Sequence, residues 1–237
     1  MPSRFAFRQF YAGDLGLFLE DGEIRAKNHA NLQRCHQTSY QEINDRRGTG
    51  VFGMPCGGVV NDYVPFYFSP LTSFAYTISR GNVPLRDFEG RELGVARNED
   101  RIFFVCNVDV FAGSGLEVCF SDLALNSNSG SPKIETNLSK LETHVDWSVF
   151  DEDPMVAGIP EIGYGGVCQF FRSVATPAKW HNRSPKRMAE FLVRGSVPLQ
   201  YVSCVVAKTE AMKDSLQAVM DASRWNIPIF AKPGCYF

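Results

Sequence analysis

One carboxylate interrupts an apolar stretch in the C-terminal third of the chain. Residues 186–193 (KRMAEFLV) alternate as a strand, and Glu190 lies on a face that is otherwise apolar. An ionised carboxylate buried in such a strand is costly unless it is paired or faces a cleft. Glu190 is therefore half of a structural ion pair, with a residue such as Arg187 or Arg183, or a strand end that reaches water, or a catalytic glutamate at the floor of a pocket.

Length and composition favour one soluble domain over residues 1–237, since 44% of the residues are hydrophobic and 21% are charged. The net charge of −2 argues against a general polyanion binder. A local basic patch is still indicated between residues 172 and 194, where Glu190 is the only acidic residue. The basic residues of this stretch are Arg172, Lys179, Arg183, Lys186, Arg187 and Arg194. The alternative is a solvated surface with uneven charge.

The seven cysteines form no C-x-x-C pair, and the four histidines lack metal-ligand spacing, so neither a disulfide framework nor a metal site is expected. The N-terminus has no apolar signal region, and no apolar run approaches the length of a membrane span. These features predict a cytoplasmic protein that does not contact membranes. Phosphate-binding glycine loops and the G-x-S-x-G and H-E-x-x-H motifs are absent from the sequence.

The N-terminal half predicts a strand over residues 5–11 and a helix from an N-cap at Asp14 to Gly22. Residues 27–55 are polar and show no sustained period, which indicates either a functional loop or a mobile surface loop. A strand follows over residues 62–68, where Pro65 indicates an edge position, an irregular stretch or a bulge.

Two tyrosines are expected to meet at one strand–helix junction. Ser69-Pro70 is typical of a helix start, so a helix should run from there to about Ser79, with Tyr76 on its second turn. Tyr67 lies at the end of the preceding strand. The two rings are either core aromatics or contacts to a ligand.

The C-terminal half predicts an α+β domain. Strands are expected over residues 101–110, 116–120, 202–206 and 227–230, and helices over 138–146 and 212–220, with a polar loop over 126–132. Residues 150–185 contain little regular pattern and are expected to cover the surface that Glu190 faces.

Read together, several motifs resemble the DarT family of DNA ADP-ribosyltransferases. The motifs are YQEINDRR (40–47), GG (57–58), DYVPFYFSP (62–70), Tyr76, DW (146–147), RMAEFLV (187–193) and the closing YF (236–237). The resemblance implies an ADP-ribosyltransferase fold, with a split, mostly antiparallel sheet and peripheral helices around a cleft for NAD. It also implies a toxin of a toxin–antitoxin or anti-phage system that modifies a base of single-stranded DNA, with a macrodomain antitoxin as its partner.

The resemblance also implies roles for particular residues. Glu190 matches the catalytic glutamate, and Arg47, or its neighbour Arg46, matches an arginine that closes over NAD and the base. Tyr67 and Tyr76 match the tyrosines that sandwich nicotinamide.

The first strand departs from the family pattern. Tyr11 and Asp14 stand where the family usually has a histidine and an asparagine for the NAD ribose. The usual arginine after Ser69-Pro70 is replaced by Leu71-Thr72, which favours guanine over thymine as the target base.

The chemistry suits these residue types, because a carboxylate stabilises the cationic sugar that forms when nicotinamide departs, and a base must leave its stack to reach that sugar. Two other functions stay open. One is ADP-ribosylation of protein or RNA, and the other is a non-catalytic nucleic-acid-binding module in which Glu190 is structural.

Overall fold

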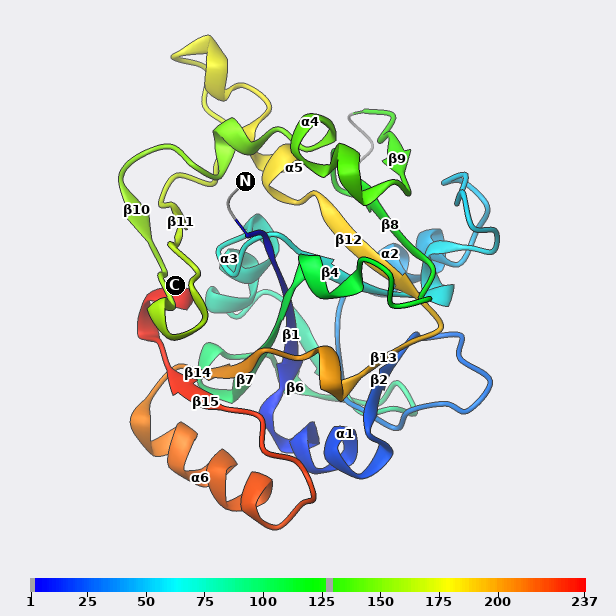
Figure 1. Cartoon of the computed structure of the whole chain (residues 1–237), viewed down its shortest axis with the longest axis vertical. Helices are drawn as coiled ribbons and strands as arrows, with labels where there is room; N and C mark the ends of the chain where they lie inside the picture. Colours follow the sequence, from blue (N-terminus) through cyan, green and yellow to red (C-terminus); the bar gives the residue numbers. More distant parts are fainter. Residues whose placement is uncertain (1–2, 127–129) are drawn as a thin grey trace.

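The computed structural model describes residues 3–126 and 130–237 and is organised around an eight-stranded sheet (Figure 1). Its neighbouring strands are antiparallel except for β14 and β15. The spatial order is β15 (Ile229–Ala231), β14 (Cys204–Ala207), β7 (Arg101–Asn107), β1 (Phe5–Tyr11), β4 (Tyr63–Tyr67), β12 (Glu190–Arg194), β8 (Val118–Ser121) and β9 (Ile134–Glu135).

Smaller elements surround this sheet. The short strands form three further sheets: β2 (Glu23–Arg25) with β13 (Ser196–Pro198), β10 (Met155–Val156) with β11 (Val167–Cys168), and β5 (Pro84–Arg86) between β3 (Gln37–Thr38) and β6 (Glu92–Val95). The α-helices are α1 (Leu15–Asp21), α2 (Gln41–Arg47), α3 (Ser73–Ser79), α4 (Leu141–His144), α5 (Arg183–Arg187) and α6 (Glu210–Asp221). In Figure 1, α1 and α6 lie at the end of the molecule opposite the projecting segment that precedes α5.

The sheet is split between β1 and β4. Seven residue pairs join β1 to β7 and five join β4 to β12, but β1 and β4 pair only at Phe7 and Tyr67. Pro65 contributes to this split because it has no backbone N–H to donate. The edge position predicted from Pro65 is wrong, because β4 lies inside the sheet, and its pairing with β12 continues through Pro65 without a register shift. The Arg8 guanidinium spans the split and donates from Nη1 to the Pro65 carbonyl at 2.8 Å.

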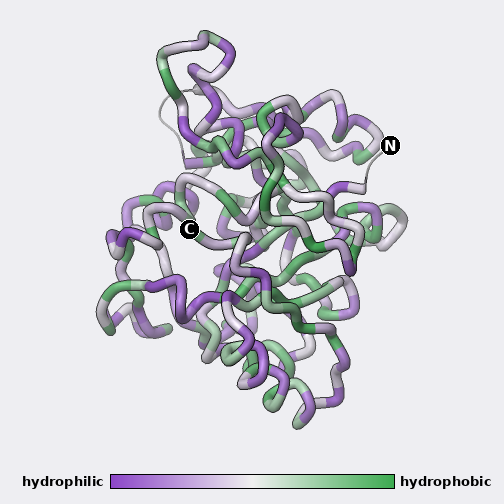
Figure 2. Tube along the Cα trace, turned by 90° about the vertical axis from the view of Figure 1, so that its left-hand side faces the viewer, coloured by the Kyte–Doolittle hydropathy of each residue, from purple (hydrophilic) through white to green (hydrophobic). Residues whose placement is uncertain are grey.

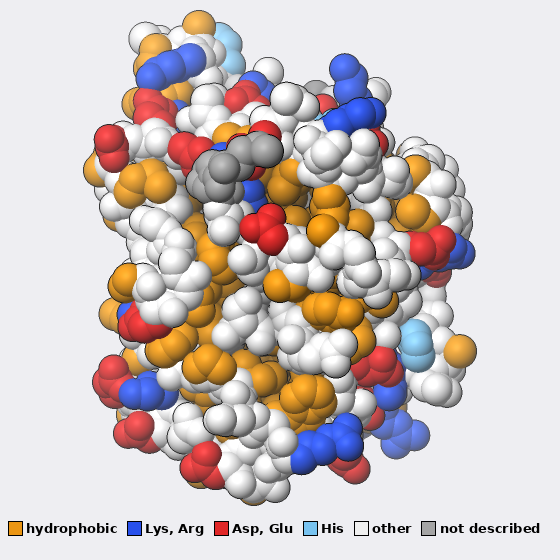
Figure 3. Space-filling view, in the orientation of Figure 1, with side chains coloured by type: hydrophobic (Ala, Val, Ile, Leu, Met, Phe, Trp, Pro, Cys, Tyr) orange, Lys and Arg blue, Asp and Glu red, His pale blue; other side chains and the backbone are white. Residues whose placement is uncertain are grey.

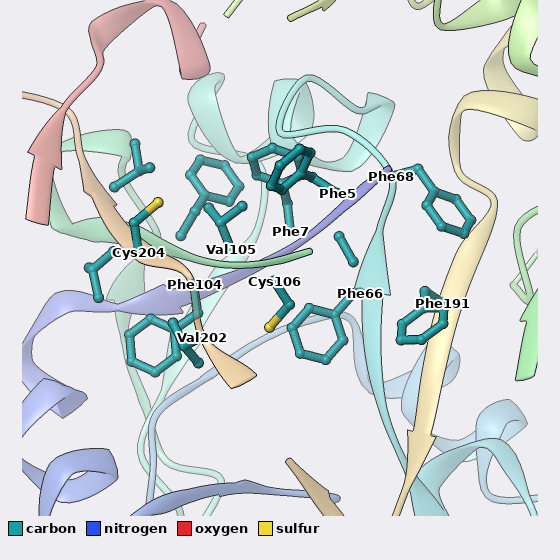
Figure 4. Packing of buried hydrophobic residues seen from close by; sticks show 14 of the residues in the cluster. Phe5, Phe7, Phe66, Phe68, Phe104, Val105, Cys106, Phe191, Val202 and Cys204 are labelled. Carbon is teal, nitrogen blue, oxygen red and sulfur yellow. The ribbon is translucent and has the colours of Figure 1, made fainter. Parts of the chain in front are cut away.

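Aromatic side chains on alternate faces of the central strands form the core. Figure 4 shows Phe5 and Phe7 of β1 on one side, with Phe104, Phe66 and Phe191 of the neighbouring strands on the other. Hydropathy follows the same arrangement, since hydrophobic stretches run through the middle of the molecule and hydrophilic ones dominate the outer loops (Figure 2). The packed strands provide a rigid base for side chains at the split.

Three local predictions need correction. The strand predicted over residues 186–193 begins only at Glu190, because residues 183–187 form α5. The helix predicted from Ser69 begins at Ser73, since the Thr72 hydroxyl caps it by accepting a hydrogen bond from the Ala75 N–H. Residues 27–55 include β3 and α2 as well as loop. Of the predicted 126–132 loop, residues 127–129 lie outside the described residues.

The predicted basic patch is also wrong in part, because its central arginines are internal. Arg187 is fully buried and donates to the carbonyls of Val149, Cys168, Phe170 and Leu71 and to the Ser69 hydroxyl. Arg183 is buried too and pairs with Glu152. On the projecting segment, basic side chains lie next to acidic ones (Figure 3). These arginines therefore anchor residues 149–171 to the sheet and are not available to DNA.

None of the helices within residues 3–126 and 130–237 is both long and apolar enough to cross a membrane.

Candidate active site

A cavity of about 460 Å³ lies along the split in the sheet. Its walls come from residues 7–10 of β1, from Tyr63, Pro65 and Tyr67 of β4, and from the segment between β2 and α2. Its described lining contains no aspartate or glutamate, although the whole chain has a net charge of −2. The cations that line it are Arg8, Arg25, Lys27, Arg34, Arg47 and Arg101. The cavity is therefore electropositive and suits an anionic ligand.

Glu190 and Arg47 form a buried ion pair beside this cavity. Glu190 is the first residue of β12 and is 1% exposed. Arg47, the last residue of α2, donates one hydrogen bond to each carboxylate oxygen, from Nη1 to Oε1 and from Nη2 to Oε2, both at 2.8 Å. Burial alone lowers the pKa of Arg47, but the Glu190 carboxylate outweighs it and raises that pKa above its ordinary value. The Arg47 guanidinium is consequently held in its charged form.

Two further hydrogen bonds fix Glu190 in place. Its Oε1 accepts from the Leu125 N–H at 3.2 Å, and its own backbone N–H donates to Ser121 Oγ at 3.0 Å. Glu190 itself is absent from the described cavity lining, whereas Arg47 belongs to it. The carboxylate thus lies behind the guanidinium, and a ligand in the cavity meets Arg47 first.

Tyr67 lies directly opposite Glu190 in the sheet and lines the cavity. Burial, and then the nearby Glu190 carboxylate, raises the pKa of its phenol above the ordinary value, so the hydroxyl stays protonated at neutral pH. It can therefore donate a hydrogen bond to a ligand. Among the predicted residues, the structure brings Glu190, Arg47 and Tyr67 together.

The predicted first-strand residues support a histidine that the sequence did not single out. Asp14 is buried, and its side chain does not cap α1; one oxygen lies 2.7 Å from Nδ1 of His36 and the other accepts from the His36 N–H at 2.8 Å. The Tyr11 ring packs on the imidazole, with ring centres 4.5 Å apart. His36 lines the cavity, whereas Tyr11 and Asp14 are outside its described lining. Tyr11 and Asp14 therefore contact a cavity-lining residue without lining the cavity themselves.

The remaining predicted residues lie away from the cavity. Tyr76 packs against Phe171 and Phe237 beneath the guanidinium of Arg172, so it does not meet Tyr67 in the cavity as expected. Helix α3 begins later than predicted, which places Tyr76 on its first turn. Arg46 points to the other side of α2, with its guanidinium 5.6 Å from the ring of Phe52.

Arg8 and Arg101, which were not predicted as site residues, also line the cavity, from β1 and β7. Arg101 is buried and donates to Thr38 Oγ1 at 2.6 Å. Each arginine stands in a predicted strand, and a basic residue in an apolar strand is the same signal that drew attention to Glu190. Among the described residues, no group of three or more His, Cys, Asp or Glu side chains is arranged to hold a metal.

The family description "ssDNA thymidine ADP-ribosyltransferase, DarT" matches residues 15–237. The chain belongs to the DarT family. Two curated relatives are each described as a DNA ADP-ribosyl transferase. The protein from Thermus sp. (strain 2.9) is 29% identical over 104 residues, a match covering 44% of this chain and 45% of that protein. The protein from Escherichia coli O127:H6 is 22% identical over 226 residues, or 94% of this chain and 86% of that protein.

Solved structures of DarT proteins share the fold. Thermus sp. 2.9 DarT in complex with ADP-ribosylated single-stranded DNA superposes with a TM-score of 0.75 at 19% identity, over 99% of this chain and 96% of that one. The same protein in complex with NAD+ gives a TM-score of 0.70 at 18% identity, over 99% and 98%. Thermosipho africanus DarTG in complex with ADP-ribose gives 0.64 at 15% identity, over 99% of this chain and 51% of that one.

The predicted family, enzyme class and fold class are therefore confirmed. The mostly antiparallel sheet with peripheral helices is the DarT fold, and its split carries the cavity. The DarT family consists of enzymes that act on single-stranded DNA.

Proposed function

We propose that this chain is a mono-ADP-ribosyltransferase that moves ADP-ribose from NAD to a base of single-stranded DNA. The observation that carries the proposal is the Glu190–Arg47 pair beside a cavity whose charged lining, among the described residues, is basic. NAD is an anionic dinucleotide, and the volume of about 460 Å³ lies within the usual range for small-molecule sites. Family membership and the NAD complex of Thermus DarT support the same donor.

Glu190 is the proposed catalytic carboxylate. Cleavage of the bond between nicotinamide and ribose leaves positive charge on the sugar, and nicotinamide departs with the bonding electrons. A carboxylate that accepts a hydrogen bond from a ribose hydroxyl stabilises that charge. The base nitrogen then bonds to the ribose carbon and loses a proton, for which Glu190 is the available carboxylate base.

Arg47 and Tyr67 complete the proposed site. Arg47 donates to both oxygens of Glu190, but Oε2 accepts no other hydrogen bond from the described residues and can still accept one from a ribose hydroxyl. The guanidinium beside it suits the phosphate or base oxygens that enter with the substrates. Tyr67, a neutral phenol on the cavity wall, supplies a flat surface for nicotinamide. His36 binds the NAD ribose, and contacts with Tyr11 and Asp14 hold its imidazole ring in place.

Labelled NAD mixed with single-stranded oligonucleotides tests the proposal. We expect label on DNA with the wild type and its loss, by at least about a hundredfold, with Glu190→Gln, since general-base assistance alone is worth about that much. Glu20→Gln, at an exposed glutamate on α1, is the matched control and should keep wild-type activity. Equal labelling of DNA by wild type and Glu190→Gln would refute the assignment.

The acceptor base is thymine or guanine. The family description names thymidine, whereas Leu71-Thr72 in place of the usual arginine favours guanine. Mass spectrometry of nucleosides from a treated oligonucleotide that contains all four bases will identify the modified one. Label on protein or RNA alone would support the second acceptor class, and DNA binding without nicotinamide release would indicate a non-catalytic module.

The biological setting follows from the family. We propose that residues 1–237 form one ADP-ribosyltransferase domain that acts as a toxin in the cytoplasm, where NAD and single-stranded DNA occur together. A cognate antitoxin with a macrodomain would reverse the modification, and the DarTG neighbour supports such a partner. Co-expression tests it, because the partner gene should rescue cells from wild-type toxin and Glu190→Gln should need no rescue.

A further inference from the structure

On the side that faces β8, strand β12 is held at its first residue by a side chain. The backbone ladder between β12 and β8 ends at the pair Phe191–Phe120. One position further along, the Glu190 N–H donates to the Ser121 hydroxyl oxygen at 3.0 Å. That hydroxyl belongs to a fully buried residue and in turn donates to the Leu123 carbonyl at 2.7 Å. Ser121 therefore joins the start of β12 to the turn that follows β8.

The same turn returns to the Glu190 side chain. Ala124 and Leu125 are buried, and the Ala124 N–H donates to the Pro185 carbonyl at 3.1 Å. The Leu125 N–H donates to Glu190 Oε1 at 3.2 Å. Residues 121–125 thus contact Glu190 both at its backbone and at its carboxylate, and the Ser121 hydroxyl lies at the start of this turn.

These contacts make the two carboxylate oxygens of Glu190 different. Oε1 accepts hydrogen bonds from Arg47 Nη1 and from the Leu125 N–H, whereas Oε2 accepts from Arg47 Nη2 alone among the described residues. A carboxylate oxygen has room for about two hydrogen bonds, so Oε1 is filled and Oε2 keeps a free position. The Leu125 N–H therefore determines which oxygen is able to accept a ribose hydroxyl.

We propose that Ser121 is a positioning residue for the reaction. Its hydroxyl holds the turn that directs the Leu125 N–H at Oε1 of Glu190, and so keeps Oε2 available to the ribose. The inference rests on the proposed function for the role of Glu190. Ser121 and Leu125 are absent from the described cavity lining, whereas Asn126, the next residue, belongs to it. Ser121 should therefore affect catalysis through Glu190 and not through contact with NAD.

The hydroxyl is needed because the groups that it joins have no replacement nearby. Without it, the buried Glu190 N–H would lack an acceptor and the Leu123 carbonyl would lose its donor, which is unfavourable. The turn would shift to satisfy both groups, and the Leu125 N–H would shift with it. A displacement of about 1 Å can cost about a hundredfold in rate. The base of the loop should stay in place, because two hydrogen bonds join Asp122 to Lys133.

Steady-state labelling of a single-stranded oligonucleotide that contains all four bases, at varied NAD concentration, tests the role of Ser121. Ser121→Ala should lower kcat by about tenfold to a hundredfold and leave KM for NAD within about twofold. Ser121→Thr and Ser121→Val add nearly the same volume, so their difference isolates the hydroxyl. The Ser121→Thr variant should keep at least about ten times the kcat of the Ser121→Val variant.

Cys119→Ala is the matched structural control. Cys119 is fully buried, lies two residues earlier on the same face of β8, and makes no side-chain hydrogen bond within the described part of the chain. Its truncation removes one buried atom from the same strand without touching the turn. The Cys119→Ala variant should therefore keep the wild-type kcat.

Hydrogen exchange at the Leu125 amide tests the positioning without any measurement of activity. This N–H is bonded inside the protein, so Ser121→Ala and Ser121→Val should speed its exchange by about tenfold, whereas Ser121→Thr and Cys119→Ala should leave it within about twofold of the wild type. Amides of β7 should keep their wild-type rates in every variant, which distinguishes a local change from a general loss of stability.

The positioning role and the proposed function can fail separately. Equal kcat in Ser121→Thr and Ser121→Val would overturn the role, as would a raised KM for NAD with unchanged kcat, which would assign Ser121 to substrate binding. If the wild type labels no DNA but the Leu125 amide responds as expected, the hold on Glu190 stands and the proposed transfer falls. If the wild type labels DNA and the Ser121 variants leave that amide unchanged, the positioning role falls alone.

Discussion

Removal of either partner of the Glu190–Arg47 pair should destabilise the protein strongly. The pair makes two hydrogen bonds of 2.8 Å, and the side chains of Arg47 and Glu190 are only 10% and 1% exposed. Arg47→Met leaves a buried carboxylate with one remaining N–H donor, from Leu125. Breaking a buried pair from one side typically costs about 3–5 kcal/mol. For a chain of this size that corresponds to a fall of about 6–20 °C in Tm.

Urea denaturation of a double-mutant cycle measures this contribution. Arg47→Met and Glu190→Gln should each lower the free energy of unfolding, and the double variant should lose about 1–3 kcal/mol less than the sum of the two. The double variant should remain inactive in the DNA-labelling assay, so stability and catalysis separate. Single variants within about 0.5 kcal/mol of wild type, or strict additivity, would refute the reasoning.

Three further changes have defined outcomes. His36→Ala should weaken NAD binding about tenfold by equilibrium titration, and Asp14→Asn less so, because Asp14 only orients the ring; unchanged affinity in both would exclude this role. Arg187→Met should lower the free energy of unfolding by about 3–5 kcal/mol, since it strands several carbonyls in the interior; a chemical melt at wild-type values would contradict this. Hydrogen bonds from Lys179 and Arg183 lower the pKa of Glu152 from 4.5 to about 2, so its stabilisation is complete above pH 4.5 and is lost as the pH falls through 2. The Tm values of wild type and Glu152→Gln should therefore converge between about pH 5 and pH 2, and a constant difference would argue against the ion pair.

Local pattern was sufficient for the elements that build the sheet. Near-continuous apolar runs in β7 and β12 indicate burial on both faces, and the spacing of Leu216 and Met220 indicates the buried side of α6. Glu190 was identified because a charge in an apolar strand conflicts with that pattern. The structure shows that two of the explanations offered for it are not exclusive, since the carboxylate is paired and also lies next to a cavity.

Features that depend on contacts between residues far apart in the sequence could not be predicted. The partner of Glu190 is Arg47, 143 residues away, and not the nearby Arg187 or Arg183. Helix α2 escaped detection because it is polar, and only the contact of its last residue with Glu190 gives it a buried side. The segment that contains Arg183 and Arg187 was expected on the surface. Charge pattern alone does not reveal which arginines are buried and donate hydrogen bonds to backbone carbonyls.

The occupied carboxylate has a consequence for the enzyme at rest. Glu190 is 1% exposed, and the Arg47 guanidinium lies between its carboxylate and the cavity, so solvent reaches this base only past Arg47. We expect this shielding to limit the transfer of ADP-ribose to water, and therefore to keep the release of nicotinamide from NAD slow when no DNA is present.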